Sequence, residues 1–156
     1  TAVSGNRFVH YYRKSAGTAL MQNFINKINQ IFGIITDSSL TPAQIIRCQK
    51  QLKQNNIAPV PDEYLQLLRF SNGLRGNGSL LAGIYPENPE LPDLLRLNLR
   101  VRHPLCRDLI ILGVNEMDYL GYNHKWQVYQ IIDKDDFEVL EEYHELTAAL
   151  NDILKI

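Results

Sequence analysis

The chain has 156 residues, 45% of them hydrophobic, which suits one domain of ordinary size and excludes pervasive disorder. It has no apolar run of the about 20 residues that cross a bilayer and no signal segment at its start, so we expect a cytoplasmic protein that binds no membrane. The net charge of −1 argues against nucleic acid as a direct partner. The charge is nevertheless polarised along the chain. Residues 1–110 contain 13 Lys and Arg and 7 Asp and Glu, whereas residues 111–156 contain 3 Lys and Arg and 10 Asp and Glu.

Three segments of the first half have a helical pattern. Residues 18–32 place Leu20, Phe24, Ile28 and Ile31 at helical spacing. Residues 41–54 follow with Thr41 as N-cap and Pro42 as first helical residue. The third helix begins at Pro61, carries Asp62 and Glu63 in its first turn, and buries a stripe of Tyr64, Leu67 and Leu68. Residues 1–16, which start with Thr1, are expected to be flexible or derived from a tag.

The second half changes character after one more strand and helix. Residues 79–85 predict a strand, and residues 92–101 predict a helix with a basic polar side. Four short segments rich in β-branched and aromatic residues then follow at 108–115, 118–123, 126–133 and 137–143, and a helix closes the chain over 145–156. This order predicts an α+β fold with a largely antiparallel sheet of about 4–6 strands, packed with N-terminal, central and C-terminal helices.

No motif points to catalysis. The glycines of "GLRGNGSL" have no lysine for a phosphate loop and follow a helix instead of opening one, so they indicate a turn between helix and strand. Cys48 and Cys106 lack the paired spacing of a zinc or redox site and are expected to be reduced thiols. The four histidines, His10, His103, His124 and His144, are scattered. We therefore expect no enzyme, no metal and no cofactor.

Two sets of charged residues remain. Basic residues in and after the predicted 92–101 helix have no interleaved aromatic platform and suit a solvated helix face: Arg96, Arg100, Arg102 and Arg107. Acidic residues are denser near the end of the chain: Asp135, Asp136, Glu138, Glu141, Glu142 and Glu145. These could be a solvated strand edge that discourages aggregation. The alternative is a docking surface for a basic protein partner, because clustered like charges speed encounter and reject wrong partners.

Residues 60–73 resemble the signature segment of the SUKH superfamily, a group of fungal cell-wall synthesis regulator-like domains and bacterial immunity proteins. The matching residues are Pro61, Asp62, Tyr64, Leu67, Leu68, Asn72 and Gly73. The later segments "LIILGVNEMDYLGYN", "WQVYQIID" and "FEVLEEYHELTAALNDIL" are similar to the strands and closing helix of the family, so the likeness covers residues 40–154. Residues 88–107 depart from a minimal member as a helical insertion, within a single SUKH-like domain of residues 1–156.

The resemblance implies a domain without catalytic activity, in which the matching motif residues are structural. Many bacterial members are immunity proteins that neutralise a cognate toxin, often a nuclease, and a basic toxin domain would suit the acidic set. A regulatory scaffold that binds a host protein or peptide is the alternative. A third possibility is a small-ligand pocket beneath the 73–83 loop, lined by Tyr64, Tyr85 and Trp126.

Overall fold

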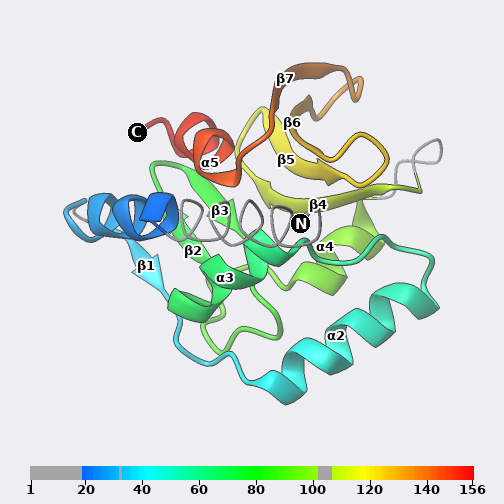
Figure 1. Ribbon diagram of the computed structural model, residues 1–156, viewed down its shortest axis with the longest axis horizontal. Helices are drawn as coiled ribbons and strands as arrows, with labels where there is room; N and C mark the ends of the chain where they lie inside the picture. The colour runs from blue at the N-terminus through cyan, green and yellow to red at the C-terminus, as the bar shows by residue number, and fades with distance from the viewer. Residues whose placement is uncertain (1–18, 32, 102–106) are drawn as a thin grey trace, which may run out of the picture. The chain divides into compact units, whose positions relative to one another are not determined.

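The computed structural model describes residues 19–31, 33–101 and 107–156 (Figure 1). The chain divides into two compact units, residues 1–32 and 33–156, and each is described by itself. In the first unit, residues 19–29 are helical and bury Met21, Phe24 and Ile28. The predicted helix is therefore present, but its apolar stripe includes Met21 in place of Leu20, which is 40% exposed. The expectations for residues 1–16, His10, Arg102, His103 and Cys106 lie outside the described residues.

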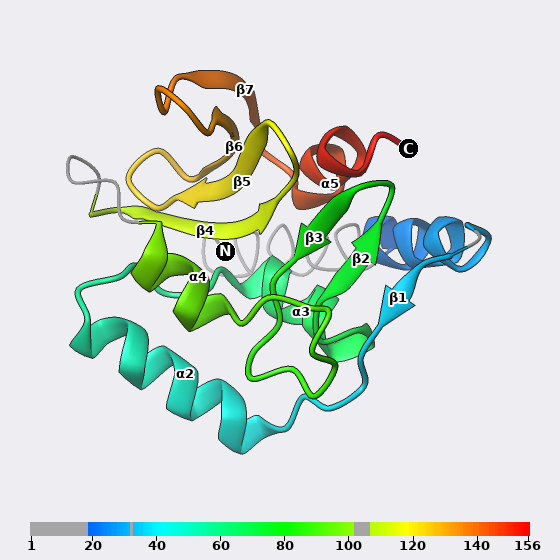
Figure 2. The same ribbon diagram turned by 180° about the vertical axis from the view of Figure 1, so that it is seen from behind.

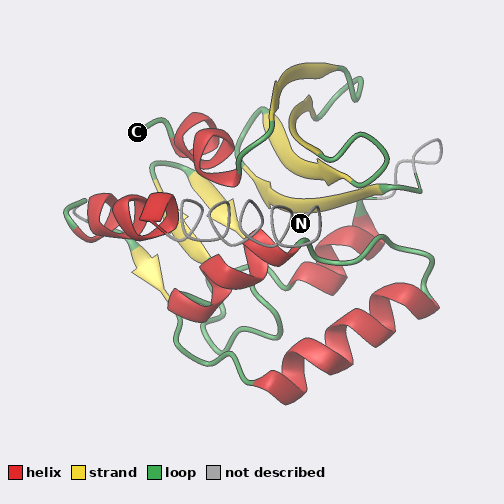
Figure 3. Cartoon of the chain, viewed as in Figure 1, coloured by secondary structure: helices red, strands yellow, loops and turns green. Residues whose placement is uncertain are grey.

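The second unit is built on one antiparallel sheet whose seven strands follow the order of the sequence. Figure 3 shows these strands in yellow and the helices in red. The strands are β1 (Ile35–Thr36), β2 (Leu74–Gly76), β3 (Ser79–Leu81), β4 (Leu109–Val114), β5 (Asp118–Asn123), β6 (Val128–Asp133) and β7 (Val139–Tyr143). The α+β class and the antiparallel sheet are confirmed. The expected number of strands, 4–6, was too low because β1 and β2, of two and three residues, are too short to carry an alternating pattern.

Four helices accompany this sheet: α2 (Pro42–Gln54), α3 (Asp62–Phe70), α4 (Leu94–Arg100) and α5 (Leu146–Leu154). Thr41 caps α2 as expected, because its hydroxyl oxygen accepts a hydrogen bond from the Gln44 N–H. The Gln44 side-chain oxygen in turn accepts a hydrogen bond from the Thr41 N–H, which completes a capping box. Helix α4 contacts β4 and α2, whereas α5 packs on β5, β6 and β7. In Figures 1 and 2, α2 and β7 lie at opposite sides of the unit.

The glycine cluster forms a β-hairpin between β2 and β3. Asn77 and Gly78 have φ values of 50° and 78° at its tip, and positive φ at both central residues is the requirement of a type I′ turn. The interpretation as a turn is therefore correct, but the turn joins two strands. The hinge that leads out of α3 is the preceding pair, Asn72 and Gly73.

Buried hydrogen bonds join helices α3 and α4 to the strands of the sheet. The fully buried Tyr64 hydroxyl contacts the carbonyl oxygens of Ala82 at 2.6 Å and Leu112 at 3.0 Å. The Asn98 amide of α4 accepts from the N–H of Ile111 at 2.7 Å and donates to the carbonyl of the same residue at 2.8 Å. Helix α4, which we expected as an insertion, is thus joined to the central strand β4, with its Leu94 and Leu97 in the core.

Candidate functional site

The acidic set lies along the last strand of the sheet. Among the described strands, β7 pairs with β6 alone, so one side of its backbone is an edge. All six predicted residues are exposed, in the turn before β7, on β7 and directly after it: Asp135, Asp136, Glu138, Glu141, Glu142 and Glu145. The structure therefore places the whole predicted set at or beside one edge of the sheet in the second unit. We call this surface the acidic edge.

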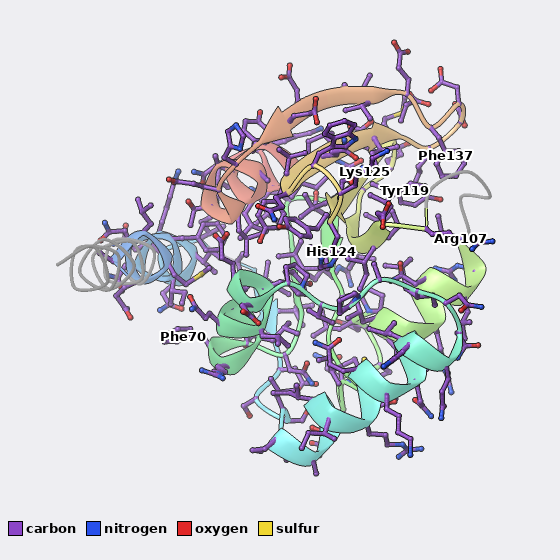
Figure 4. All side chains as sticks on the ribbon, turned by 45° about the vertical axis from the view of Figure 1, so that its right-hand side comes forward. Phe70, Arg107, Tyr119, His124, Lys125 and Phe137 are labelled. Carbon is purple, nitrogen blue, oxygen red and sulfur yellow. The ribbon has the colours of Figure 1, made fainter. Side chains whose placement is uncertain are left out.

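The turn that begins the acidic edge is held by its own polar groups. One Asp133 carboxylate oxygen accepts from the N–H groups of Asp135 at 2.8 Å and Asp136 at 3.2 Å. Phe137 has a left-handed backbone (φ 59°), and its ring stacks on Tyr119 of β5 at a centroid distance of 6.0 Å (Figure 4). The acidic side chains are consequently displayed from a defined turn.

The acidic edge also exposes apolar surface. Val139 pairs with Ile132 and Glu141 pairs with Ile131, so Leu140 is the extra residue of a β-bulge. Val139 and Leu140 are 42% and 47% exposed. A β-bulge and several charges on an edge strand oppose edge-to-edge association with a second copy of the same strand. They do not oppose the binding of a partner that carries the opposite charge.

The charges of the acidic edge are not neutralised by ion pairs within the described part of the chain, where the single salt bridge joins Arg75 and Glu90. Glu142 does accept a hydrogen bond from the Gln130 amide at 3.1 Å. Asp118 adds a further negative charge near this edge, because it lies directly opposite Asp133 in the pairing of β5 with β6. Burial, and next the carboxylates of Asp133 and Asp152, raise the pKa of Asp118.

The predicted ligand pocket is not formed by the three residues that were expected to line it. Tyr64 is fully buried in the core, and Trp126 is 65% exposed in the turn before β6, which begins at Val128 and not at Trp126 as predicted. Of the three, Tyr85 lines a groove of about 660 Å³ between α2 and residues 85–96, and neither Tyr64 nor Trp126 lines this groove. Arg47 and Arg96 also line it. Sequence reasoning missed Arg47 because one basic residue on an amphipathic helix is ordinary.

The SUKH-like motif residues have structural positions. Pro61 is the N-cap of α3, and Asp62 lies in the first turn of that helix. Tyr64, Leu67 and Leu68 are buried on α3, as expected. Asn72 is fully buried, and Gly73 has φ +93°, a conformation that favours glycine.

The cysteine and histidine candidates form no metal cluster among the residues that the structure describes. Within the described residues no three His, Cys, Asp or Glu side chains gather as a metal site would need. Cys48 is a free thiol whose pKa burial raises to about 12. The His124 ring lies 2.7 Å from the Pro59 carbonyl oxygen, and His144 is exposed. Searched over the same residues, the chain has no helix of the length and apolarity that a bilayer crossing requires.

Comparison with protein-family models finds no match to the chain, and comparison with curated proteins finds none. The SUKH resemblance therefore rests on the order and spacing of the sequence motifs alone.

Proposed function

We propose that the protein is a non-catalytic binding domain that holds a basic protein partner along the acidic edge. The observation that carries this proposal is the exposure of six carboxylates on and around the outermost strand, with no salt bridge to any of them among the described residues. A structural role in the fold would require partners within the chain. Asp136 and Glu142 each accept one hydrogen bond, from the Glu138 N–H and the Gln130 amide, but no described basic residue pairs with the set. An exposed set without basic partners is best explained by a ligand of opposite charge or by protection of the edge.

The geometry of the edge gives a partner two kinds of contact. The carboxylates attract positive charge over about a Debye length and orient the encounter. Val139 and Leu140 can then be covered by apolar side chains of the partner, and the outer backbone groups of β7 can pair with an added strand. A second copy of this chain is disfavoured as the partner because its own edge carries the same charge.

The SUKH resemblance directs the proposal to a biological role. We propose an immunity protein that neutralises a cognate bacterial toxin, often a nuclease in this family. Nucleases carry basic surfaces because they bind the phosphate backbone, so an acidic binding edge would cover such a surface. The polarised charge of the chain supports this role independently of the motifs.

A growth-rescue assay tests the role. The product of the reading frame next to this gene is expressed in a bacterial host, with and without this protein. Rescue of growth and formation of a complex by the two purified proteins are the expected results. If the neighbouring product is not toxic, or is toxic and not rescued, the immunity role is wrong. A reproducible endogenous partner unrelated to toxins, bound at the same edge, would then indicate a regulatory scaffold.

A further inference from the structure

A groove on the other side of the second unit has features that the acidic edge does not explain. It has a volume of about 660 Å³ and lies between α2 and the segment 85–96. Sites for small ligands have volumes of about 300–1,000 Å³, so the groove is large enough for a molecule of several rings. Its walls include Arg47 and Gln51 of α2, Tyr85, and Arg96 of α4.

Tyr85 is fixed as one wall of this groove. Its backbone has φ 45°, a left-handed conformation that a bulky residue keeps only when the surrounding structure holds it there. The Tyr85 N–H donates to Asp93 at 2.9 Å, and the Tyr85 hydroxyl bonds the Gln51 side chain. An aromatic ring held in a strained backbone by contacts at both ends is already in place for a ligand, which would lose little freedom by packing on it.

Two guanidinium groups of the groove are available for an anion. The Cζ atom of Arg47 lies 5.1 Å from the centroid of the Tyr85 ring, which is a cation–π contact. This contact involves the charge of the guanidinium group, so its N–H groups remain able to donate hydrogen bonds to other acceptors. Arg96 is exposed, and neither arginine forms a salt bridge with another described residue. Both side chains are thus free to form the forked hydrogen bonds that guanidinium groups make to phosphate.

Asp93 is the acidic residue among those that line the groove, and its oxygens are already used. One oxygen accepts from the Tyr85 N–H, and the other accepts from the Arg96 N–H at 3.0 Å as the cap of α4. Asp93 therefore fixes the backbone of the groove, while the two arginines leave the lining with an excess of one positive charge.

We propose that this groove binds a small phosphate monoester attached to a planar ring, with the ring on Tyr85 and the phosphate between Arg47 and Arg96. A monoester carries about −1.5 to −2 charges at neutral pH, which matches two guanidinium groups. The proposal does not depend on the acidic edge.

Calorimetric titration of the full chain tests the proposal with adenosine 5′-monophosphate, phenyl phosphate and inorganic phosphate. The test variant is R47Q with R96Q. The control is K50Q with R100Q, which removes the same charge from exposed positions of α2 and α4 that do not line the groove. Circular dichroism checks that both variants fold. In parallel, the amide resonances of the unsubstituted protein are followed during titration, which needs no variant.

We expect saturable binding of one or both ring-bearing probes, about tenfold weaker in R47Q/R96Q and changed less than about threefold in K50Q/R100Q. The resonances of Arg47, Gln51 and Tyr85 should shift. Tighter binding of the adenosine nucleotide would identify a nucleotide site, and equal or tighter binding of phenyl phosphate a site for simpler aryl phosphates. The proposal is wrong if neither probe saturates below about 5 mM, if inorganic phosphate binds equally well, if both variant pairs weaken binding equally, or if the resonance shifts lie elsewhere.

Discussion

Asn72 shows how one buried residue can connect distant segments. Its side-chain oxygen accepts from the Ile84 N–H at 2.7 Å, and its amide donates to the Ile84 carbonyl at 2.9 Å and to Ser39 Oγ at 3.1 Å. Its backbone N–H donates to the Asp37 carbonyl at 2.6 Å. The Asn-Gly break of the SUKH-like motif thus joins the end of α3 to the loop after β1 and to the loop after β3.

Asn72→Ala should lower the free energy of unfolding by about 2–4 kcal/mol, because it leaves the N–H and the carbonyl of Ile84 buried without their partners. Urea unfolding measures the loss. Asn26→Ala is the control, since Asn26 is exposed and should change stability by less than about 0.5 kcal/mol. Equal stability of the two variants would contradict this role of Asn72.

Asp118 is expected to destabilise the fold at neutral pH. Burial raises the pKa of Asp118 above 3.8, its ordinary value, so folding disfavours its charged form. This penalty is fully present above the raised pKa and is lost as the pH falls below 3.8. Asp118→Asn should therefore raise the free energy of unfolding at pH 7 by about 0.5 kcal/mol, since solvent screens much of the repulsion.

Urea unfolding at several pH values checks the sign of this effect. The advantage of Asp118→Asn should shrink as the pH is lowered, and Glu87→Gln, at an exposed acid outside this cluster, should show no such trend. A gain that persists at pH 3 would mean that charge is not its cause.

At the level of elements, the β2–β3 hairpin depends on glycine in two different ways. Gly78 has φ +78° and no atom within 4 Å of an added Cβ, whereas Gly73 has φ +93° and would bring a Cβ to 3.0 Å from the Leu81 carbonyl oxygen. The first glycine is required for conformation alone. The second is required for conformation and for space.

Gly78→Ala should lower the free energy of unfolding by about 1–2 kcal/mol, the cost of a left-handed backbone for a residue with a Cβ. Gly73→Ala should cost about 1–3 kcal/mol more because of the crowding. Gly78→Asn should be milder than Gly78→Ala although its side chain is larger, since Asn tolerates this conformation. Chemical denaturation of the three variants tests the order, and a larger loss for Gly78→Ala than for Gly73→Ala would refute it.

The elements that the sequence predicted best have long periodic patterns. The strand predicted over 118–123 matches β5 in both bounds, and Tyr64, Leu67 and Leu68 of α3 are buried as their spacing indicated. The strand expected over 79–85 ends at Leu81, because the chain leaves the sheet to bond with Asn72 and Asp93. Such tertiary contacts have no periodicity. The acidic edge was predictable because its residues lie close together in the sequence, whereas the groove joins Arg47 to Tyr85 and Arg96 across the fold.

At the scale of the whole second unit, the charge asymmetry of the sequence becomes an asymmetry in space. Exposed basic residues lie on α2 and α4, and the exposed acidic set lies on and around β7, a strand at the opposite side from α2 (Figures 1 and 2). A charge distribution of this kind orients an approaching partner before contact. The acidic edge therefore attracts cationic partners, whereas the basic surface of α2 and α4 attracts anions.

Reversing part of the acidic edge should slow association with a basic partner. We expect Glu141→Lys with Glu142→Lys to lower the association rate constant about tenfold at low salt, with a smaller effect on dissociation, because long-range attraction acts on the encounter. The difference should nearly vanish at about 1 M salt, where the Debye length is about 3 Å.

The control variant is Glu87→Lys with Asp108→Lys, at exposed positions outside the acidic edge. It makes the same change in net charge and should have a weaker effect. Stopped-flow measurements with the partner found by growth rescue would determine these rates. Equal rates for the two variants would show that net charge, and not the acidic edge, governs association.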